Sequence, residues 1–275
     1  MKKILLMATA LIMAASCGQK APKVLVLYYS QTGVTRTVAE ELQARLGADI
    51  ESVQAVHPYD GDFMATIERS RQEMESGICP ELEPLQVNVR DYDVIFLGFP
   101  VWFGTYAVPI ATLLNTNDFS GKKIVPFCTF GSGGLDSSER ALAERLGDSE
   151  ILPGYGVRAA RIEAMPAELD RFLKRGGFID GKCEPLPEFP EQKPVTKEVS
   201  AIFDAAVGDY PMINAKAETV ASRNVPGGVE YCFTARDLPR DNGRFKADEV
   251  MMFRTLTVYV LAEEGKTPVF TQVVR

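Results

Sequence analysis

The chain has 275 residues, which is enough for one large domain or two modest ones, and we expect two. Hydrophobic residues make up 46% and charged residues 24%, so the composition is that of an ordinary globular protein. The formal net charge of −7 argues against a nucleic-acid-binding protein, because contact with many phosphates requires a basic surface.

The N-terminus has the order of an export signal. Lys2 and Lys3 precede an apolar run, Ile4–Met13, which is too short to span a membrane. Small residues then lead directly to Cys17, which resembles a bacterial lipoprotein cleavage site. The resemblance implies an exported bacterial lipoprotein with signal peptide 1–16, an acylated Cys17 and a tether 17–22, anchored to the membrane and facing the periplasm or the cell surface. The open alternative is an ordinary secretory signal in which Cys17 is coincidental.

A strand, a polar turn and a helix are predicted between Val24 and Leu42. The apolar run Val24–Tyr28 suits a strand that is buried on both faces of a parallel sheet. Apolar residues at helical spacing begin at Val38, so the turn aims free backbone N–H groups and the positive end of a helix dipole at one point. An anion is expected there. The candidate ligands are the turn residues Ser30, Gln31, Thr32, Gly33, Val34 and Thr35.

This turn differs from the loops of nucleotide triphosphatases. It has no Lys and no G-x-x-x-x-G-K-[ST] run, so a single phosphate monoester held by neutral donors is the better fit. The open alternative is that Ser30 or Thr32 serves only as an ordinary helix N-cap.

A family resemblance rests on the same stretch. Val26-Leu27-Tyr28-x-Ser30-x-x-Gly33-x-Thr35-x-x-x-Ala39-x-x-Leu42 matches, position for position, the pattern by which flavodoxins are recognised. The resemblance to the flavodoxin-like superfamily implies that FMN binds here by its phosphate. One departure is Val34, where Asn is the commonest residue of the family.

An aromatic stretch follows the next informative strand, which is predicted at Asp93–Phe99. It contains the only Trp of the chain, and it offers flat faces on which a planar ring can stack. By itself it could equally be a hydrophobic loop that covers a helix end. Its sequence resembles the P-I-W-W-G loop of a branch of flavodoxin-like proteins, where that loop lines the isoalloxazine ring. The resemblance implies the same role for Pro100, Val101, Trp102, Phe103 and Gly104.

A third loop is rich in glycine and hydroxyl groups. It follows a predicted strand, Ile124–Thr129, and precedes a predicted helix, Ser137–Leu146. Thr129, Phe130 and Gly131 would suit contact with the pyrimidine edge of a flavin or with its ribityl chain. The open alternative is a flexible surface turn.

Strands and helices alternate five times between residues 23 and 176, ending with a strand near Ile151–Val157 and a helix at Ala167–Arg175. Five such units with right-handed crossovers form a three-layer α/β sandwich. The resemblance implies a flavodoxin-like, five-stranded parallel sheet in the order 2-1-3-4-5. The three unusual loops follow the first, third and fourth strands, so we expect them to meet at one edge.

The remainder reads as a Pro-rich linker, 177–194, and a small α+β domain, 195–275. One amphipathic helix, Thr196–Val207, precedes segments typical of an antiparallel meander. The segment ETVASRNVPGGVEYCF faintly resembles cystatin-like domains, but its VPGG departs from their pattern and protease inhibition is not implied. We expect this domain to serve as a packing module or to bind a protein partner.

The Cys and His residues give no sign of a metal site. His57 is the only histidine, and it has no paired Cys or second His. The remaining cysteines are even in number, but their spacing selects no disulfide pairing. They are Cys79, Cys128, Cys183 and Cys232.

The leading functional expectation is an FMN-binding flavodoxin-like redox protein outside the cytoplasm. It would transfer electrons or catalyse NAD(P)H-dependent reduction of a quinone-like acceptor, and the sequence identifies neither the donor nor the acceptor. Because the flavin would perform the chemistry, no catalytic side chain is expected. The alternative is a non-redox surface lipoprotein that uses the same scaffold to bind a ligand or a partner.

Overall fold

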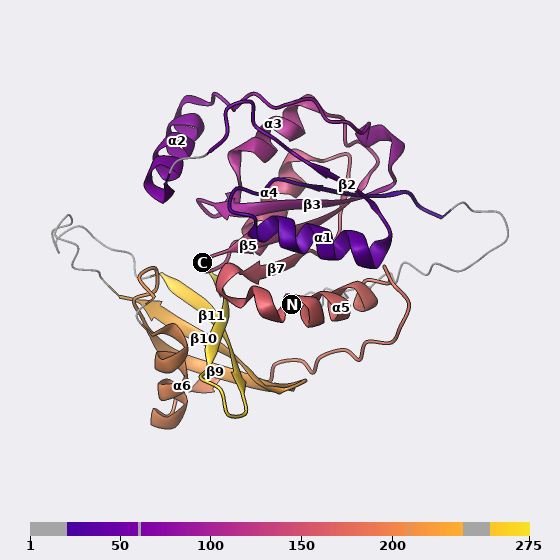
Figure 1. Cartoon of the computed structure of the whole chain (residues 1–275). Helices are drawn as coiled ribbons and strands as arrows, with labels where there is room; N and C mark the ends of the chain where they lie inside the picture. The colour runs from indigo at the N-terminus through magenta and orange to yellow at the C-terminus, as the bar shows by residue number, and fades with distance from the viewer. Residues whose placement is uncertain (1–20, 60–61, 209, 239–253) are drawn as a thin grey trace. The chain divides into compact units, whose positions relative to one another are not determined.

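The structure is a computed structural model, and it describes residues 21–59, 62–208, 210–238 and 254–275 (Figure 1). The predicted signal peptide and Cys17 lie outside the described residues. The chain divides into two compact units. The first comprises the chain up to Phe130 together with Leu135–Glu184, and the second comprises Gly131–Gly134 and Pro185–Arg275.

The first unit is built on a parallel sheet. Its strands run in the order β2-β1-β3-β5-β6, and β7 pairs with β5 farther along the same edge. The predicted order is confirmed, although the fifth strand is divided into the two short pieces β6 and β7. The bounds are β1 Val24–Tyr28, β2 Asp49–Ser52, β3 Val94–Trp102, β5 Lys123–Phe130, β6 Glu150–Ile151 and β7 Tyr155–Arg158. A short strand β4, Thr105–Tyr106, pairs antiparallel with the end of β3.

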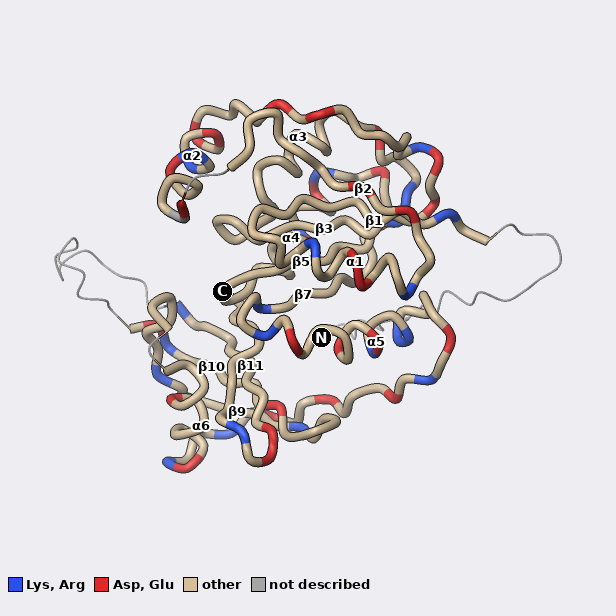
Figure 2. The backbone as a smooth tube through the Cα atoms, in the orientation of Figure 1, with Lys and Arg blue, Asp and Glu red and all other residues tan. Residues whose placement is uncertain are grey.

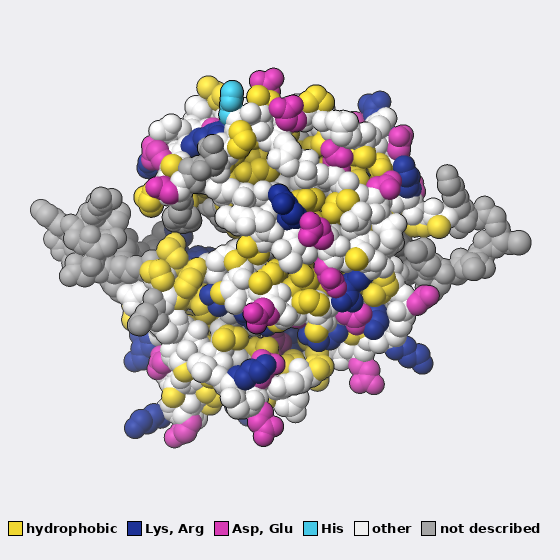
Figure 3. All heavy atoms as spheres, viewed as in Figure 1, with side chains coloured by type: hydrophobic (Ala, Val, Ile, Leu, Met, Phe, Trp, Pro, Cys, Tyr) yellow, Lys and Arg dark blue, Asp and Glu magenta, His cyan; other side chains and the backbone are white. Residues whose placement is uncertain are grey.

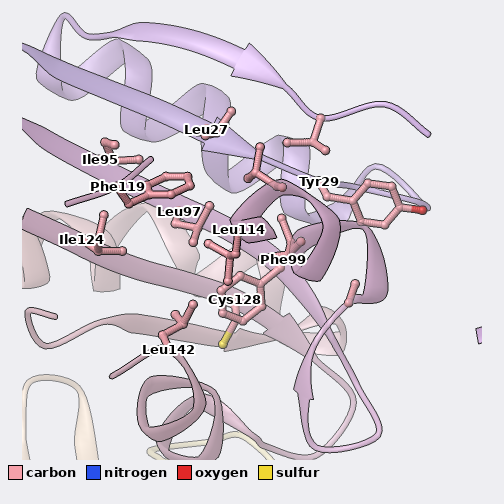
Figure 4. Packing of buried hydrophobic residues seen from close by; sticks show 14 of the residues in the cluster. Leu27, Tyr29, Ile95, Leu97, Phe99, Leu114, Phe119, Ile124, Cys128 and Leu142 are labelled. Atoms are coloured by element: carbon pink, nitrogen blue, oxygen red, sulfur yellow. The ribbon is translucent and has the colours of Figure 1, made fainter. Parts of the chain in front are cut away.

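Helices cover both faces of this sheet. Side chains alternate along each strand, so Val26 packs with α1 and α5 while Leu25 and Leu27 pack with α3 and α4 on the other face. Figure 4 shows Leu27 in the second of these clusters, together with Leu114 of α3 and Leu142 of α4. Burial on both sides explains why the strands are continuous apolar runs. The predicted three-layer sandwich is therefore confirmed. The helices are α1 Val34–Leu46, α2 Phe63–Ser76, α3 Val108–Thr116, α4 Leu135–Arg145 and α5 Met165–Arg175, with 3₁₀ turns at Val89–Asp91 and Ala159–Ala164.

The second unit is an antiparallel sheet with one helix, as predicted. Its strands run in the order β12-β11-β10-β9-β8, and Phe203 of α6 packs against Phe233 of β10 in its core. Ser132 belongs to this unit, and its carbonyl oxygen accepts a hydrogen bond from the N–H of Val273 at 2.7 Å. The bounds are β8 Lys193–Pro194, α6 Lys197–Val207, β9 Ala215–Val225, β10 Gly228–Asp237, β11 Thr255–Glu263 and β12 Val269–Val274.

Half of the predicted Pro-rich linker is packed. Residues from Pro185 onward belong to the second unit, where the ring of Phe189 lies 6.0 Å from that of Tyr259. The guanidinium of Arg223 lies over the Phe189 ring at 4.1 Å, and Gln192 accepts a hydrogen bond from the Thr234 hydroxyl at 2.6 Å. This segment therefore covers the sheet face opposite α6, because Tyr259 and Thr234 alternate with the core-facing side chains of their strands.

Charges of both signs are interspersed along the chain in each unit (Figure 2), and on the face drawn in Figure 3 acidic and basic side chains alternate with apolar ones. Within the described part of the chain, no helix combines the length and the apolar character that crossing a membrane requires.

Candidate functional site

The turn after β1 leaves the start of α1 open. Gly33 is the N-cap residue of α1 with φ of 90°, and as a glycine it has no side chain that could cap the helix. A Cβ atom at Gly33 would meet no atom within 4 Å, so there is free space beside the N-terminus. The unbonded N–H groups of a first helical turn and the positive end of the dipole together favour an anion at this position.

The hydroxyls of the turn are used differently from one another. The Ser30 hydroxyl oxygen accepts a hydrogen bond from the N–H of Arg36 at 3.2 Å, whereas Thr32 is exposed. The Ser30 side chain thus satisfies one N–H of the first turn of α1, which is part of what the N-cap alternative expected, although the N-cap residue itself is Gly33. Thr35 is buried, and its Oγ1 lies 2.8 Å from Oγ1 of Thr129. One of these two hydroxyls donates to the other, so only one hydrogen of the pair remains for a ligand.

Gln31 points its amide into the protein. Its Nε2 donates to Oγ1 of Thr66 at 2.7 Å and to the carbonyl oxygen of Tyr59 at 3.2 Å. An amide nitrogen has two hydrogens, and both are engaged by these bonds. The side chain predicted as a phosphate ligand therefore has no donor left while both bonds are made.

The predicted aromatic loop is a β-hairpin. Pro100, Val101 and Trp102 continue β3 beyond the predicted end at Phe99, and Trp102 pairs with Thr105 of β4. The two turn residues, Phe103 and Gly104, have φ of 50° and 82°, which is the pattern of a type I′ turn. The Ser137 hydroxyl of α4 donates to the carbonyl oxygen of Gly104. Regular pairing extends this stretch because it satisfies backbone groups that a loop would leave to water.

Phe103 at the hairpin tip is strained and exposed. It is the one non-Gly residue with positive φ among those that the structure describes, and its exposed fraction is 49%. Strain of this kind in a bulky residue persists where the surroundings impose it and is enriched at functional sites.

The loops after β1 and β3 meet through aromatic rings. The ring of Trp102 lies 5.7 Å from that of Tyr29 and 5.1 Å from that of Tyr59, edge to face in both cases. Figure 4 shows Tyr29 at the margin of the core cluster, with its hydroxyl directed away from the labelled aliphatic side chains. Burial raises the pKa of Tyr29 well above its usual range, so the phenol stays neutral.

The predicted residues after the fourth strand are mostly part of that strand. Thr129 and Phe130 end β5, where Phe130 pairs with Arg158 of β7, and the side chain of Phe130 is buried in the core. Gly131 follows β5 and belongs to the second unit. Within the first unit, the Thr35–Thr129 bond and the Tyr29–Trp102 contact thus join the ends of β1, β3 and β5.

Several residues of this site escaped the sequence prediction. Tyr29 directly follows β1, which is the signal that identified the aromatic stretch after β3, whereas Tyr59 lies seven residues beyond the end of β2 and had no such signal. Arg36 also escaped it, because it lies one residue beyond the predicted turn. Its positive charge is beside Tyr28. Burial raises the pKa of Tyr28, and the charge of Arg36 opposes that rise.

Across the residues that the structure describes, no group of three His, Cys, Asp or Glu side chains is placed to hold a metal ion.

Comparison with known proteins gives the family. Residues 23–164 match the model of the family described as Flavodoxin. A candidate flavoprotein from Bacteroides eggerthii DSM 20697 is 31% identical, with 55% of this chain and 97% of that chain covered and a TM-score of 0.48. A second, from Bacteroides uniformis ATCC 8492, is 28% identical over 55% and 99% of the two chains, with a TM-score of 0.49.

A further similar structure is a flavoprotein from Lactobacillus acidophilus NCFM in complex with FMN, which is 24% identical over 55% of this chain and 98% of that chain, with a TM-score of 0.47. Comparison with the curated proteins gives no match. The family match covers just over half of the 275 residues and includes all of β1 to β7. The chain belongs to the flavodoxin family.

Proposed function

We propose that the protein binds FMN in its first unit and acts as a redox protein. The observation that carries this proposal is the joining, at the carboxyl edge of one parallel sheet, of a helix N-terminus that begins at a glycine, Gly33, and an aromatic hairpin at Trp102. The first suits a phosphate, and the second suits a planar ring. Membership of the flavodoxin family supports the same cofactor.

The residues present fit FMN in a specific way. The phosphate would be held by the N–H groups at the start of α1 and by the hydroxyls of Ser30 and Thr32, and the one remaining hydrogen of the Thr35–Thr129 pair would be a further donor. Trp102 and Phe103 would shield one part of the ring from water. The bound flavin supplies the electron transfer, and the protein binds and orients it and adjusts its surroundings.

The proposal also includes the reaction that the protein carries out and the place in the cell where it does so. The protein would either exchange electrons with protein partners or reduce a quinone-like acceptor with NAD(P)H. It would do so outside the cytoplasm, as a lipoprotein anchored through Cys17, and the support for this is the sequence of residues 1–17. Replacing Cys17 by Ser should move the protein from the membrane fraction to the soluble fraction of the producing cells.

The decisive measurement is an absorption spectrum of the purified protein, followed by titration with FMN. We expect flavin absorbance or saturable uptake of one FMN per chain. A protein that carries no flavin and takes up none would overturn the proposal. NADPH consumption with a quinone would then separate a reductase from an electron carrier, which exchanges electrons only with its protein partners.

A second candidate is a non-redox surface protein, and the observation that favours it is the second unit. Its antiparallel sheet lies wholly beyond residue 164, where the family match ends. Replacing Thr32 by Ala discriminates between the two. It should weaken FMN binding if the turn holds the phosphate, and it should leave binding of any unrelated ligand unchanged.

A further inference from the structure

Three aromatic rings from three separate segments form a closed cluster in the first unit. Tyr29 follows β1, Tyr59 follows β2, and Trp102 ends β3. Ring centroids lie 6.2 Å apart for Tyr29 and Tyr59, 5.1 Å for Tyr59 and Trp102, and 5.7 Å for Tyr29 and Trp102, all edge to face. Tyr59 is 6% exposed, so its ring is enclosed by its neighbours. Such contacts restrict the orientation of Trp102.

Helix α2 holds Tyr59 from the other side. Thr66, Arg69 and Glu73 are three and four residues apart and share one face of the helix. The guanidinium of Arg69 lies 3.8 Å from the centre of the Tyr59 ring, and its Nε donates to Glu73 at 2.8 Å. The Tyr59 hydroxyl donates to the same carboxylate. The ring is therefore held on its face and at its hydroxyl.

The backbone of this segment is held as well. One guanidinium nitrogen of Arg69 donates to the carbonyl oxygens of His57 and Pro58, each at 2.9 Å. Gln31, in the turn that would hold the phosphate, donates to the carbonyl oxygen of Tyr59 and to Thr66. Gln31 thus ties the phosphate turn to the Tyr59 segment and to α2.

We propose that Tyr59 is a positioning residue for Trp102 in the ring half of the flavin site, held by α2 and tied to the phosphate turn through Gln31. This inference rests on the proposed FMN site and assigns Gln31 a role different from that of a phosphate ligand. The buried Thr66 of α2 accepts the hydrogen bond of Gln31, so the inference also gives Thr66 a role in supporting the flavin site. A change at Thr66 should therefore alter flavin binding in the same way as a change at Gln31.

The test is a double-mutant cycle with two ligands. Gln31→Leu and Thr66→Val each remove the hydrogen bond, and each should weaken binding of FMN and of riboflavin by the same factor, about three- to tenfold. The double variant should lose no more than the larger single loss. Gln72→Leu is the matched control, because its amide bonds to Glu68 on the exposed side of α2 and its loss should leave both affinities unchanged.

A second readout needs no flavin. Trp102 is the only Trp of the chain, so the emission spectrum of the protein without flavin reports on this cluster. Tyr59→Leu should shift that emission towards longer wavelength, as water reaches the indole, whereas Tyr59→Phe keeps the ring and should preserve it. Thr66→Val should produce a smaller shift in the same direction, and it keeps the test valid if Tyr59→Leu does not fold.

The possible results distinguish a failure of the FMN-binding proposal from a failure of the positioning role of Tyr59. If the wild-type protein binds neither FMN nor riboflavin, the proposed function fails, while the emission of the variants still tests the support of Trp102. If the wild-type protein binds flavin but Thr66→Val changes neither affinity nor emission, the positioning role is wrong. A loss at Gln31→Leu that is confined to FMN, with riboflavin binding intact, would make Gln31 a phosphate ligand and would also overturn the inference.

Discussion

The hydroxyl oxygens of Thr35 and Thr129 lie 2.8 Å apart in the interior of the first unit, although the two residues are 94 positions apart in the sequence. Thr35 lies in the first turn of α1 and Thr129 lies near the end of β5. Both are almost fully buried, so neither hydroxyl can exchange this bond for one to bulk water. The contact joins the start of α1, after the turn that we propose to hold the phosphate, to the strand end on which the third predicted loop begins.

Breaking this bond from one side should destabilise the fold. Thr129→Val leaves the Thr35 hydroxyl without this partner in a buried position, which costs about 1–3 kcal/mol. The double variant Thr35→Val/Thr129→Val should lose less than the sum of the two single losses, because it leaves no orphaned hydroxyl. Urea unfolding of the four proteins measures this, and strictly additive losses would contradict it.

Replacing Gly33 should affect both stability and flavin binding. Its φ of 90° is unfavourable for a residue with a Cβ, so Gly33→Ala should lower the free energy of unfolding by roughly 1–2 kcal/mol without a steric clash. Gly47→Ala, at the other end of α1 with φ of 58°, is the control with a similar conformational cost. Only Gly33→Ala should weaken FMN binding. Equal losses of FMN affinity in both variants would show that the effect is global.

Relieving the strain at Phe103, the hairpin tip, should increase the stability of the protein and weaken flavin binding. Asn suits the first position of a type I′ turn, so Phe103→Asn should raise the free energy of unfolding of the flavin-free protein by about 0.5–2 kcal/mol. It should also weaken binding of FMN and riboflavin alike, since an aromatic face is lost. Ile78→Asn removes another exposed apolar side chain without positive φ and should show neither effect. Unchanged flavin affinity in Phe103→Asn would remove Phe103 from the site.

Glu139 should make stability fall as the pH rises above the ordinary carboxyl range. Burial raises the pKa of Glu139 above its ordinary 4.5, with a further rise from Asp136, although the N–H of Gly154 donates to its carboxylate at 2.7 Å and opposes the shift. The folded state therefore binds this proton more tightly than the unfolded state does. Stability linked to Glu139 is present below pH 4.5 and is lost as the pH rises through the raised pKa.

Urea unfolding of the wild-type protein and of Glu139→Gln across this range tests the sign. The free energy of unfolding of the wild-type protein should fall relative to the variant with increasing pH, and the difference should level off once Glu139 is ionised in both states. A free energy of unfolding of the wild-type protein that rises relative to that of the variant with increasing pH would contradict the prediction. Glu144→Gln, an exposed position in the same helix, is the control and should show no such dependence.

The cysteines should differ in reactivity. Cys79, Cys128, Cys183 and Cys232 are all free thiols in the structure. Burial raises the pKa of the Cys128 thiol, so both access and thiolate formation are disfavoured. A thiol-specific reagent should label the half-buried Cys183 in the native protein and should reach Cys128 only after unfolding. Fast labelling of native Cys128 would contradict its burial.

The strand order was predicted from the sequence through a family resemblance, but the location of the strands came from local patterns. The apolar runs at Val24–Tyr28 and Val94–Phe99 are buried on both faces, and such burial leaves a signal in consecutive residues. The start of α1 after Gly33 was visible for the same reason, because a strand, a turn and a helix lie in one short segment.

Two predictions differed from the structure where pairing partners decide the conformation. The Pro content of 177–194 indicated a linker, yet Phe189 packs on Tyr259, seventy positions away. The glycine and aromatic residues after Phe99 indicated a loop, yet Trp102 pairs with Thr105 once Phe103 takes positive φ. The conformations of these two segments depend on contacts with distant residues, and neither the Pro content nor the aromatic content of a segment reveals such contacts.

The sequence by itself therefore determined which segments form the parallel sheet, which turn opens the helix N-terminus, and which family the first unit belongs to. Only the tertiary structure decided that the Gln31 amide turns to Tyr59 and Thr66, and that Thr35 meets Thr129. The physical reason is that periodicity along the chain encodes burial, whereas a side-chain hydrogen bond depends on which strand ends the fold brings together.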